Sequence, residues 1–350
     1  MSGKTEPGPG PRLRTRRAER GQALVMFVLA AGVLFGFIAM TIDVGLILHQ
    51  RRVLQNTADA AALAGAIELP NSPGLAYDKA QEWAENNGID TASGDQLDIT
   101  VNTLDNSVSV RVEREQGFMF GRVLGLVSTQ VHADATARVG SPLSLSGILP
   151  FGVLESAVNY NGDPTIIKYD ATNPSNGNFG PLRIDGNGSA VLQRSIKYGT
   201  QTGVCAQSQP ACLDPTAPTE TGNTISAVRE GFAYRFTNTS ASCDDFTEVL
   251  IPDGNGSYRI NGACNPFLGA QDSLRLVLVP AITSFPNGSK PVTLKYFTAL
   301  FLNDLQSNKC TGNACEVTGT FVKVVADPAN DATLGTYDPV NGVKLVRLVE

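Results

Sequence analysis

The stretch that decides how this chain is organised runs from Glu19 to Ala66 and reads ERGQALVMFVLAAGVLFGFIAMTIDVGLILHQRRVLQNTADAAALAGA. Within it, residues 23–42 form a run of twenty uncharged, mostly apolar residues that ends at Asp43. A helix rises about 1.5 Å per residue, so a run of this length spans roughly the 30 Å hydrocarbon core of a bilayer. The stretch therefore predicts a membrane-spanning helix near the N-terminus.

Basic residues are distributed unevenly around this run. Lys4 and five arginines between positions 12 and 20 precede it, whereas Arg51 and Arg52 follow it. Because basic residues favour the cytoplasmic side, we expect the N-terminus in the cytoplasm and the chain beyond residue 50 outside it. A cleaved signal peptide is the alternative, but its apolar core is usually only about 7–15 residues long. The predicted location is the cell (inner) membrane, crossed once.

The exported part of the chain is acidic and rich in turn-forming residues. Residues 1–50 hold six basic and three acidic residues, a net charge of +3, whereas the remainder holds 21 basic and 30 acidic residues, a net charge of −9. An acidic surface does not attract nucleic acid, so we expect no nucleic-acid partner. Gly and Pro contribute 35 and 20 residues, which favours a loop-rich β protein.

The N-terminal half of the sequence divides into three parts. Residues 1–20, rich in Pro, Gly and Arg, are expected to form a disordered cytoplasmic tail. The apolar helix should continue as a helical stem to residue 69, so that 21–69 form one unit, because the helix meets no proline before positions 70 and 73. Residues 70–140 predict a small α+β unit, with helices at 75–86 and 117–126 and strands at 96–104, 107–114 and 128–139.

Residues 141–350 predict a β-rich extracytoplasmic domain, which makes the fold class α+β. Its strand candidates are 165–169, 258–260, 274–282, 292–301, 316–325 and 343–349. Between Asn173 and Asp272 the sequence is rich in Asn and Gly and shows little periodicity, so apart from the strand candidate at 258–260 it indicates no clear elements.

Six cysteines lie in this last region, at Cys205, Cys212, Cys243, Cys264, Cys310 and Cys315. An even number in an oxidising compartment indicates disulfides. The sequence separations favour Cys205–Cys212 and Cys310–Cys315, which leaves Cys243–Cys264, although other connectivities stay open. A zinc site would need closely spaced cysteines or histidine partners. The only histidines are His49 and His132, so we expect no metal at these cysteines.

Two features of the anchor and stem are candidates for helix packing or assembly. The first is a stripe of small residues at three- and four-residue spacing: Ala58, Ala61, Ala62, Gly65 and Ala66. Such a stripe lets another element approach closely, either in the chain's own following domain or in another subunit. The second is Asp43, which should either reach water at the outer interface or contact a partner's transmembrane helix.

The residues of the anchor and stem carry a resemblance to a known family. The segments Glu19–Gln22, Ile42–Gly45 and Arg51–Ala66 resemble the N-terminal module of TadE/TadG-like proteins of tight-adherence (Flp) pilus assembly. The segments Gly177–Leu182 (GNFGPL) and Pro218–Gly231 (PTETGNTISAVREG) are similar, more loosely, to the continuation of TadG-like chains. The resemblance implies a membrane-anchored envelope protein of a pilus or secretion apparatus.

The resemblance also suggests a processing site and a metal site. Some relatives resemble prepilins, which are cut after a glycine and carry glutamate five residues later. The corresponding cut would fall between Gly21 and Gln22, but Met26 occupies the glutamate position, which disfavours cleavage. TadG-like proteins often carry a von Willebrand A domain, whose metal motif Asp-x-Ser-x-Ser occurs here at 105–109. Its place at a hairpin corner favours a turn aspartate instead.

A repeated DGNGS sequence, at Asp185–Ser189 and Asp253–Ser257, is a second candidate for metal binding. Its alternating oxygens resemble the first half of a calcium loop. The glycine at position six and the glutamate at position twelve of such a loop are missing in both copies, because Ala190 and Ile196 or Tyr258 and Cys264 stand there. Asn-Gly is also a strong hairpin signal, so turns are the favoured interpretation.

These observations predict a structural protein rather than an enzyme. The sequence lacks a Gly-x-Ser-x-Gly elbow, a P-loop and a Gly-x-Gly-x-x-Gly motif after a strand, so we expect no catalytic residues and no cofactor. The predicted function is a membrane-anchored extracytoplasmic component of a Tad/Flp-type pilus assembly or secretion system, acting through helix packing and a protein-binding head. The alternative is a surface-displayed adhesion module that recognises a cell-wall or host ligand.

Overall fold

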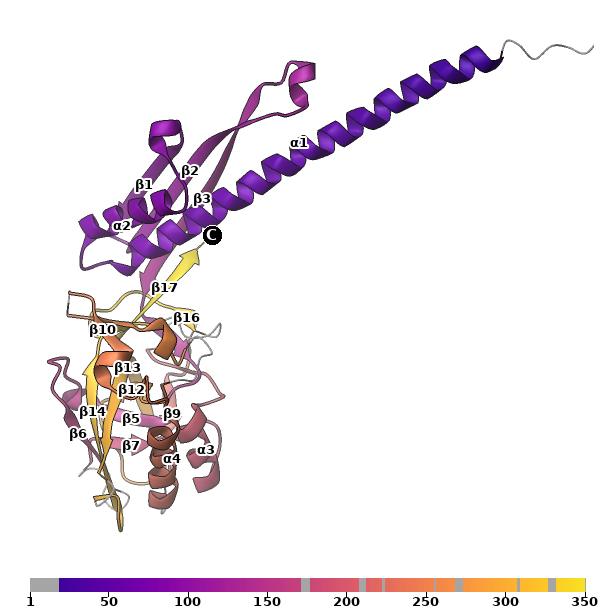
Figure 1. Ribbon diagram of the computed structural model, residues 1–350. Coiled ribbons are helices and arrows are strands. Elements are labelled where there is room, and N and C mark those ends of the chain that lie inside the picture. The colour runs from indigo at the N-terminus through magenta and orange to yellow at the C-terminus, as the bar shows by residue number, and fades with distance from the viewer. Residues whose placement is uncertain are drawn as a thin grey trace, which may run out of the picture.

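A single long helix, α1 (Glu19–Ile67), joins the anchor to the stem and projects as a rod from the rest of the molecule (Figure 1). The computed structural model describes residues 19–170, 177–207, 212–221, 224–254, 256–267, 273–306, 309–326 and 332–349, with side chains from residue 23 onward. The predicted tail thus lies outside the described residues, except for positions 19 and 20. A turn separates α1 from α2 (Pro73–Asn86), so the predicted break at the prolines is confirmed.

The apolar run of α1 is uncovered by the rest of the described chain. Phe27 and Leu29, for example, are 71% and 66% exposed. The described residues contain one helix that is long and apolar enough to cross a membrane, and it begins at Ala23 within α1. A continuous apolar surface of this kind suits contact with lipid and not with water.

A seven-stranded sheet packs against the second half of α1. Its strands follow the order β1 (Gln96–Asn102), β2 (Ser107–Gly117), β3 (Ser128–Gly140), β17 (Val343–Val349), β15 (Val324–Val325), β11 (Tyr258–Ile260) and β10 (Leu250–Pro252). Helices α1 and α2 cover one face of its β1–β2–β3 part, where alternate residues of β3 from Val131 to Val139 are buried. Of the helix–strand–strand–helix–strand order expected for residues 70–140, the first helix and the three strands are present.

The last strand of the chain belongs to this first sheet. β17 runs antiparallel to β3, with Leu345 opposite Gly140 and Val349 opposite Thr136. A domain division was expected at residue 140, with β3 before it and β17 after it. The sheet crosses that division. One edge of β3 pairs with β2, and its other edge would be unpaired if β17 did not hydrogen-bond to it.

A second sheet forms the body farthest from the anchor (Figure 1). Its order is β6 (Thr165–Asp170), β14 (Ala314–Val322), β13 (Pro291–Leu305), β12 (Leu276–Ile282), β5 (Phe151–Leu154) and β7 (Phe179–Pro181), with β9 (Thr216–Pro218) paired to β13. A small third sheet joins β16 (Thr333–Leu334), β4 (Pro142–Leu145) and β8 (Val204–Cys205).

The second sheet is covered on both faces. Every residue of β12 is buried, and its side chains alternate between two hydrophobic clusters. Leu276 and Leu278 belong to one cluster, whereas Val277 and Val279 belong to the other. Both faces of the strand are apolar, which is why the sequence shows a continuous apolar run here rather than alternation.

The segment between Asn173 and Asp272 contains two helices that its sequence pattern did not indicate. They are α3 (Ser189–Tyr198) and α4 (Ile225–Asn238), which pack on each other and on one face of the second sheet, whereas α5 (Phe246–Val249) is a single turn. The apolar face of α4 is interrupted by Gly231 and by buried Arg235. A Cβ at Gly231 would lie 2.6 Å from Cγ2 of Ile196, so α3 and α4 are too close here for a larger side chain. A glycine therefore stands where a helical pattern would show an apolar residue.

All six cysteines form disulfides within the second half of the chain. The pairs are Cys205–Cys212, Cys243–Cys264 and Cys310–Cys315, as their spacing predicted. The first DGNGS copy, for which a turn was expected, forms no hairpin: it leads directly into α3, with Gly188 at the helix start. The second copy does connect two antiparallel strands, β10 and β11, although Asn255 lies outside the described residues.

Candidate functional site at the tip of the hairpin between β2 and β3

Ten residues connect β2 to β3, from Phe118 to Val127, and we call them the hairpin tip. They were expected to be helical, but only Gly121–Leu124 form a turn of 3-10 helix (η2). Gly125 ends this turn at a φ of +85°, a conformation that L side chains rarely adopt. The N–H of Phe118 donates to the carbonyl of Val127 at 3.0 Å, which closes the tip.

The carboxylate of Asp43 on α1 binds the backbone of the hairpin tip. Its Oδ1 accepts the N–H of Met119 at 2.7 Å, and its Oδ2 accepts the N–H groups of Phe120 at 3.1 Å and Gly121 at 2.6 Å. The first N–H groups of a helical turn lack partners within the turn, and a carboxylate supplies them. Asp43 is only 6% exposed as a result.

Neither expectation for Asp43 included this contact within the chain. The side chain is buried, and its carboxylate binds backbone N–H groups of a loop of the same chain. Sequence reasoning missed the tip because η2 is too short to show helical periodicity. The available signal was its composition, FMFGRVLGLV, with Arg122 as the one charged residue among ten.

An apolar groove of about 790 Å³ separates the hairpin tip from α1. On the helix side it is lined by Val33, Phe37 and Met40, and on the hairpin side by Phe120 and Leu124, among other apolar residues. Asp43 is the charged residue in its lining and stands beside the hairpin contact. The tip thus faces the predicted membrane-spanning run across a space that, apart from Asp43, is bordered by apolar residues.

The stripe of small residues on α1 is buried inside the chain. Ala58, Ala61, Ala62 and Ala66 have no exposed surface and share a cluster with α2, β2 and β3. A Cβ at Gly65 would lie 2.7 Å from the carbonyl oxygen of Ala76 on α2. Of the two alternatives, packing on the chain's own following unit is the one that the structure contains.

Close to this cluster, an ion pair connects β2 to the segment before β1. Arg114 donates from Nε and Nη2 to the two carboxylate oxygens of Asp95, at 2.8 and 2.5 Å, and from Nη2 to the carbonyl of Gly88. The hydrogen bond from Arg114 lowers the pKa of Asp95 below its usual value and outweighs the burial that would raise it. The pair fastens the loop after α2 to the sheet.

The candidate metal residues are committed to contacts within the chain. Asp185 accepts hydrogen bonds from the hydroxyl of Ser195 at 2.6 Å and from the N–H of Thr202 at 2.8 Å. Burial raises the pKa of Asp185, but the hydrogen bonds together lower it by more than burial raises it. The pKa of Asp185 therefore lies below its usual value. Asp105 accepts from Ser107 at the hairpin corner. In the described part of the chain no three His, Cys, Asp or Glu residues gather closely enough to hold a metal ion.

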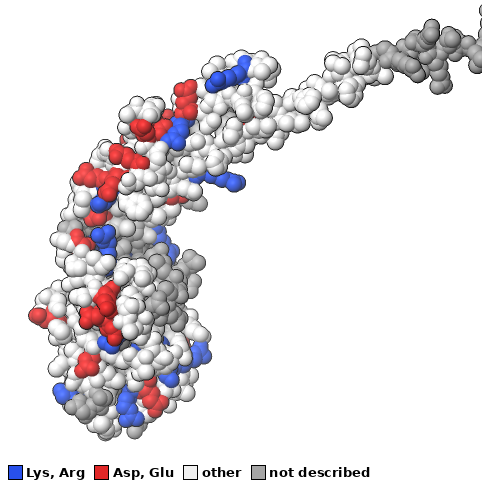
Figure 2. Space-filling view, in the orientation of Figure 1, with Lys and Arg blue, Asp and Glu red and all other residues white. Residues whose placement is uncertain are grey.

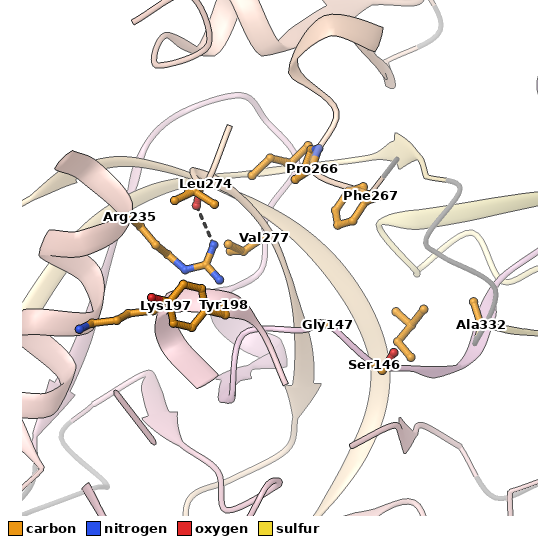
Figure 3. A pocket seen from close by; sticks show the side chains of 12 residues that line it. Ser146, Gly147, Lys197, Tyr198, Arg235, Pro266, Phe267, Leu274, Val277 and Ala332 are labelled. Atoms are coloured by element: carbon orange, nitrogen blue, oxygen red, sulfur yellow. Dashed lines mark hydrogen bonds between the residues drawn. The ribbon is translucent and has the colours of Figure 1, made fainter. Parts of the chain in front are cut away.

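A smaller pocket of about 160 Å³ lies beside α3 and α4 (Figure 3). Arg235 lines it, donating from Nη1 to the carbonyl of Leu274 at 2.8 Å and from Nε to that of Ile196. Burial lowers the pKa of Arg235 to about 10, so the guanidinium remains charged at neutral pH. Its two carbonyl partners belong to the last turn of α3 and the approach to β12, which makes it a connector between these elements.

The helix that carries the apolar run, Asp43 and the small-residue stripe has relatives. Residues 21–68 match the Tad family model, putative Flp pilus-assembly TadE/G-like. The matching segment covers α1 almost completely and ends before α2. It confirms the resemblance of the anchor and stem, and it supports a pilus-assembly context with membrane association. Neither the curated proteins nor the solved structures contain a match to this chain.

Proposed function

We propose that this protein is a bitopic, extracytoplasmic component of a Tad/Flp-type pilus assembly or secretion system, with its N-terminus in the cytoplasm. The observation that carries the proposal is the coincidence of the Tad-like segment, residues 21–68, with a helix that begins as an apolar rod and ends inside a folded core. The basic residues before the run and the disulfides after it support this orientation.

The continuity of α1 supports an architectural role. The helix leaves the apolar run at Asp43 and reaches the buried cluster around Leu54 and Ala58 without a break. A helix without a hinge holds its attached sheet at a set distance and angle from the membrane. The head is thereby positioned, and not merely tethered, beside the other membrane subunits of the apparatus.

The contribution of the head is protein binding and not catalysis. Three of its charged side chains could in principle take part in chemistry: Asp43, Asp185 and Arg235. Each is instead hydrogen-bonded to backbone groups of the same chain. Charges held by such hydrogen bonds stabilise connections between elements. The acidic outer surface of the unit made by α2 and β1 is available to a partner (Figure 2).

Deletion of the gene in the native host, followed by complementation, tests this proposal. The complementing chains are the full-length protein and a form in which residues 1–42 are replaced by a cleavable signal peptide, which releases the folded head from the membrane. We expect the deletion to remove surface pili, the full-length chain to restore them, and the released head to fail. Normal pili in the deletion strain would contradict the proposal, and normal pili with lost attachment would instead support the adhesion alternative.

The orientation has a separate test in inverted membrane vesicles. Added protease should remove only the residues before the apolar run, a loss of about 2 kDa at roughly 110 Da per residue, and leave the head intact. Digestion of the head from the cytoplasmic side would contradict the proposed topology, whatever the result of the complementation.

A further inference from the structure

We infer that the hairpin tip, Phe118–Val127, inserts into the extracytoplasmic leaflet of the membrane beside α1, with lipid acyl chains as the occupant of the groove between them. The inference rests on the proposed topology, in which residues 23–42 span the bilayer. It adds a second point of membrane contact, made by a β-hairpin, to a protein whose family match covers only the helix.

The side chains of the hairpin tip suit a membrane and not water. Val123 and Leu124 are 88% and 83% exposed, and the other exposed large apolar residues of the tip are Met119, Phe120, Leu126 and Val127. A soluble surface seldom concentrates so many apolar side chains in one loop, and such a patch marks a site of contact with protein or membrane. In Figure 2, the projecting helix and the outer end of the hairpin carry few charged residues, whereas charges are frequent over the rest of the body.

The position of the hairpin tip relative to α1 selects the membrane. The groove is bordered by Val33 and Phe37 on one side and by Leu124 on the other, so the tip is level with the apolar run. At about 1.5 Å per residue, Val33 lies roughly 15 Å from Asp43 along the helix, which is half of the hydrocarbon thickness. If this part of α1 is in lipid, the tip that faces it is in the same leaflet.

Most backbone N–H groups of the hairpin tip have partners within the chain, as entry into lipid requires. Irregular backbone is tolerated at membrane depth only when its polar groups find partners within the protein. The N–H groups of Met119, Phe120 and Gly121 are satisfied by Asp43, and that of Phe118 by the carbonyl of Val127. This requirement explains why a carboxylate stands directly at the end of the apolar run.

The one charge of the hairpin tip is directed towards its base. A Cβ at Gly117, the last residue of β2, would lie 3.3 Å from Nη2 of Arg122. The guanidinium therefore folds back from the apolar end of the tip towards the strands. In the proposed arrangement this is the level of the lipid head groups, where a long basic side chain reaches phosphate while its stem stays in the apolar layer.

A second protein helix is the competing occupant, and exposure favours lipid over it. A helix docked in the groove would cover its inner walls but would leave the outer side of Val123 and Leu124 bare. Lipid surrounds the tip on all sides and covers both. The apolar run of α1 is likewise bare on every side, so one environment accounts for both surfaces.

Tryptophan quenching in proteoliposomes tests the inference with the full-length chain. Trp83, on α2, is the only tryptophan and is replaced by phenylalanine. Leu124→Trp then reports on the tip, and Leu104→Trp, in the turn at the other end of β2 and 95% exposed, is the matched control. Both positions are exposed, so neither substitution disturbs the core, and Val123→Trp repeats the measurement at the neighbouring position. The vesicles contain phosphatidylethanolamine and phosphatidylglycerol, with or without bromine in the acyl chains.

We expect brominated lipid to quench the L124W and V123W emission by at least half and to leave the L104W emission unchanged, while aqueous acrylamide does the reverse. Strong acrylamide quenching of L124W would place the tip in water and overturn the inference. Protection of L124W from both quenchers would show that protein covers the tip, and it too would overturn the assignment to lipid. A Phe35→Trp variant tests the membrane anchor separately from the hairpin tip. If brominated lipid fails to quench its emission, residues 23–42 do not span the bilayer, and the proposed function is wrong.

Discussion

The Oδ2 atom of Asp43 accepts the N–H of Gly121 at 2.6 Å, although 78 residues separate them in the sequence. This bond joins the outer end of the apolar run to the tip of a β-hairpin. The helix α1 and the hairpin between β2 and β3 are therefore held side by side at the hairpin tip as well as at the sheet.

Replacing Asp43 should release the hairpin tip. Asp43→Ala removes all the acceptors for three N–H groups, and a hydrogen bond to a charged group is worth about 1.5–3 kcal/mol. We expect amide exchange at Met119, Phe120 and Gly121 in lipid nanodiscs to accelerate by roughly tenfold or more, at 1.4 kcal/mol per factor of ten. Asp98→Asn on the exposed side of β1 serves as the control. Unchanged protection at the tip would mean that Asp43 does not hold it.

Adding a methyl group to the small-residue stripe should loosen the stem. The Cβ of Gly65→Ala would lie 2.7 Å from the carbonyl oxygen of Ala76 and 3.0 Å from the Cβ of Ala80. Helix propensity favours alanine by about 1 kcal/mol, but overpacking costs about 1–3 kcal/mol, so the midpoint of thermal unfolding should fall. Gly74→Ala on α2 meets nothing within 4 Å, and it should be neutral or slightly stabilising. Equal midpoints for both variants in detergent would argue against tight packing at Gly65.

The three disulfides should differ in how much they stabilise the head. Cys243–Cys264 closes a separation of 21 residues, whereas Cys310–Cys315 closes one of 5. In the chain-entropy account the longer loop contributes about 3 kcal/mol and the shorter about 1 kcal/mol less. Alanine replacement of both cysteines of a pair should therefore lower the denaturation midpoint more for the first pair, measured under non-reducing conditions. The opposite order would show that strain or residual structure dominates.

The ion pair between Asp95 and Arg114 makes part of the stability depend on acid pH. Because the pKa of Asp95 is lower in the folded chain, its contribution is present above the unfolded value of about 3.9 and is lost as the pH falls through the folded pKa. Asp95→Asn should cost about 1 kcal/mol near neutral pH and flatten the loss of stability below about pH 4. Asp134→Asn breaks an exposed pair with Arg111 and should change little. Parallel pH profiles for wild type and Asp95→Asn would refute this assignment.

Much of the fold was predictable from local patterns. The strands β1, β2 and β3 alternate between apolar and polar residues with one face towards α1 and α2, and their bounds agree with the predicted ones to within a few residues. The helices α3 and α4 were not predictable in this way, because close contact at Gly231 and a buried Arg235 replace the apolar residues that mark a helix face. The site was missed for a related reason: a turn as short as η2 has no period to detect.

The sequence by itself determined the apolar anchor, the stem and the family resemblance of the N-terminal segment, and it favoured the disulfide pairs that form, because each depends on residues that are close together along the chain. Only the tertiary structure decided which surfaces these elements use. It buried the small-residue stripe within the chain, paired β17 with β3 and directed Asp43 to Gly121. Such choices depend on contacts between distant segments, where hydrogen-bond donors left over by one element are satisfied by another, and no local pattern records them.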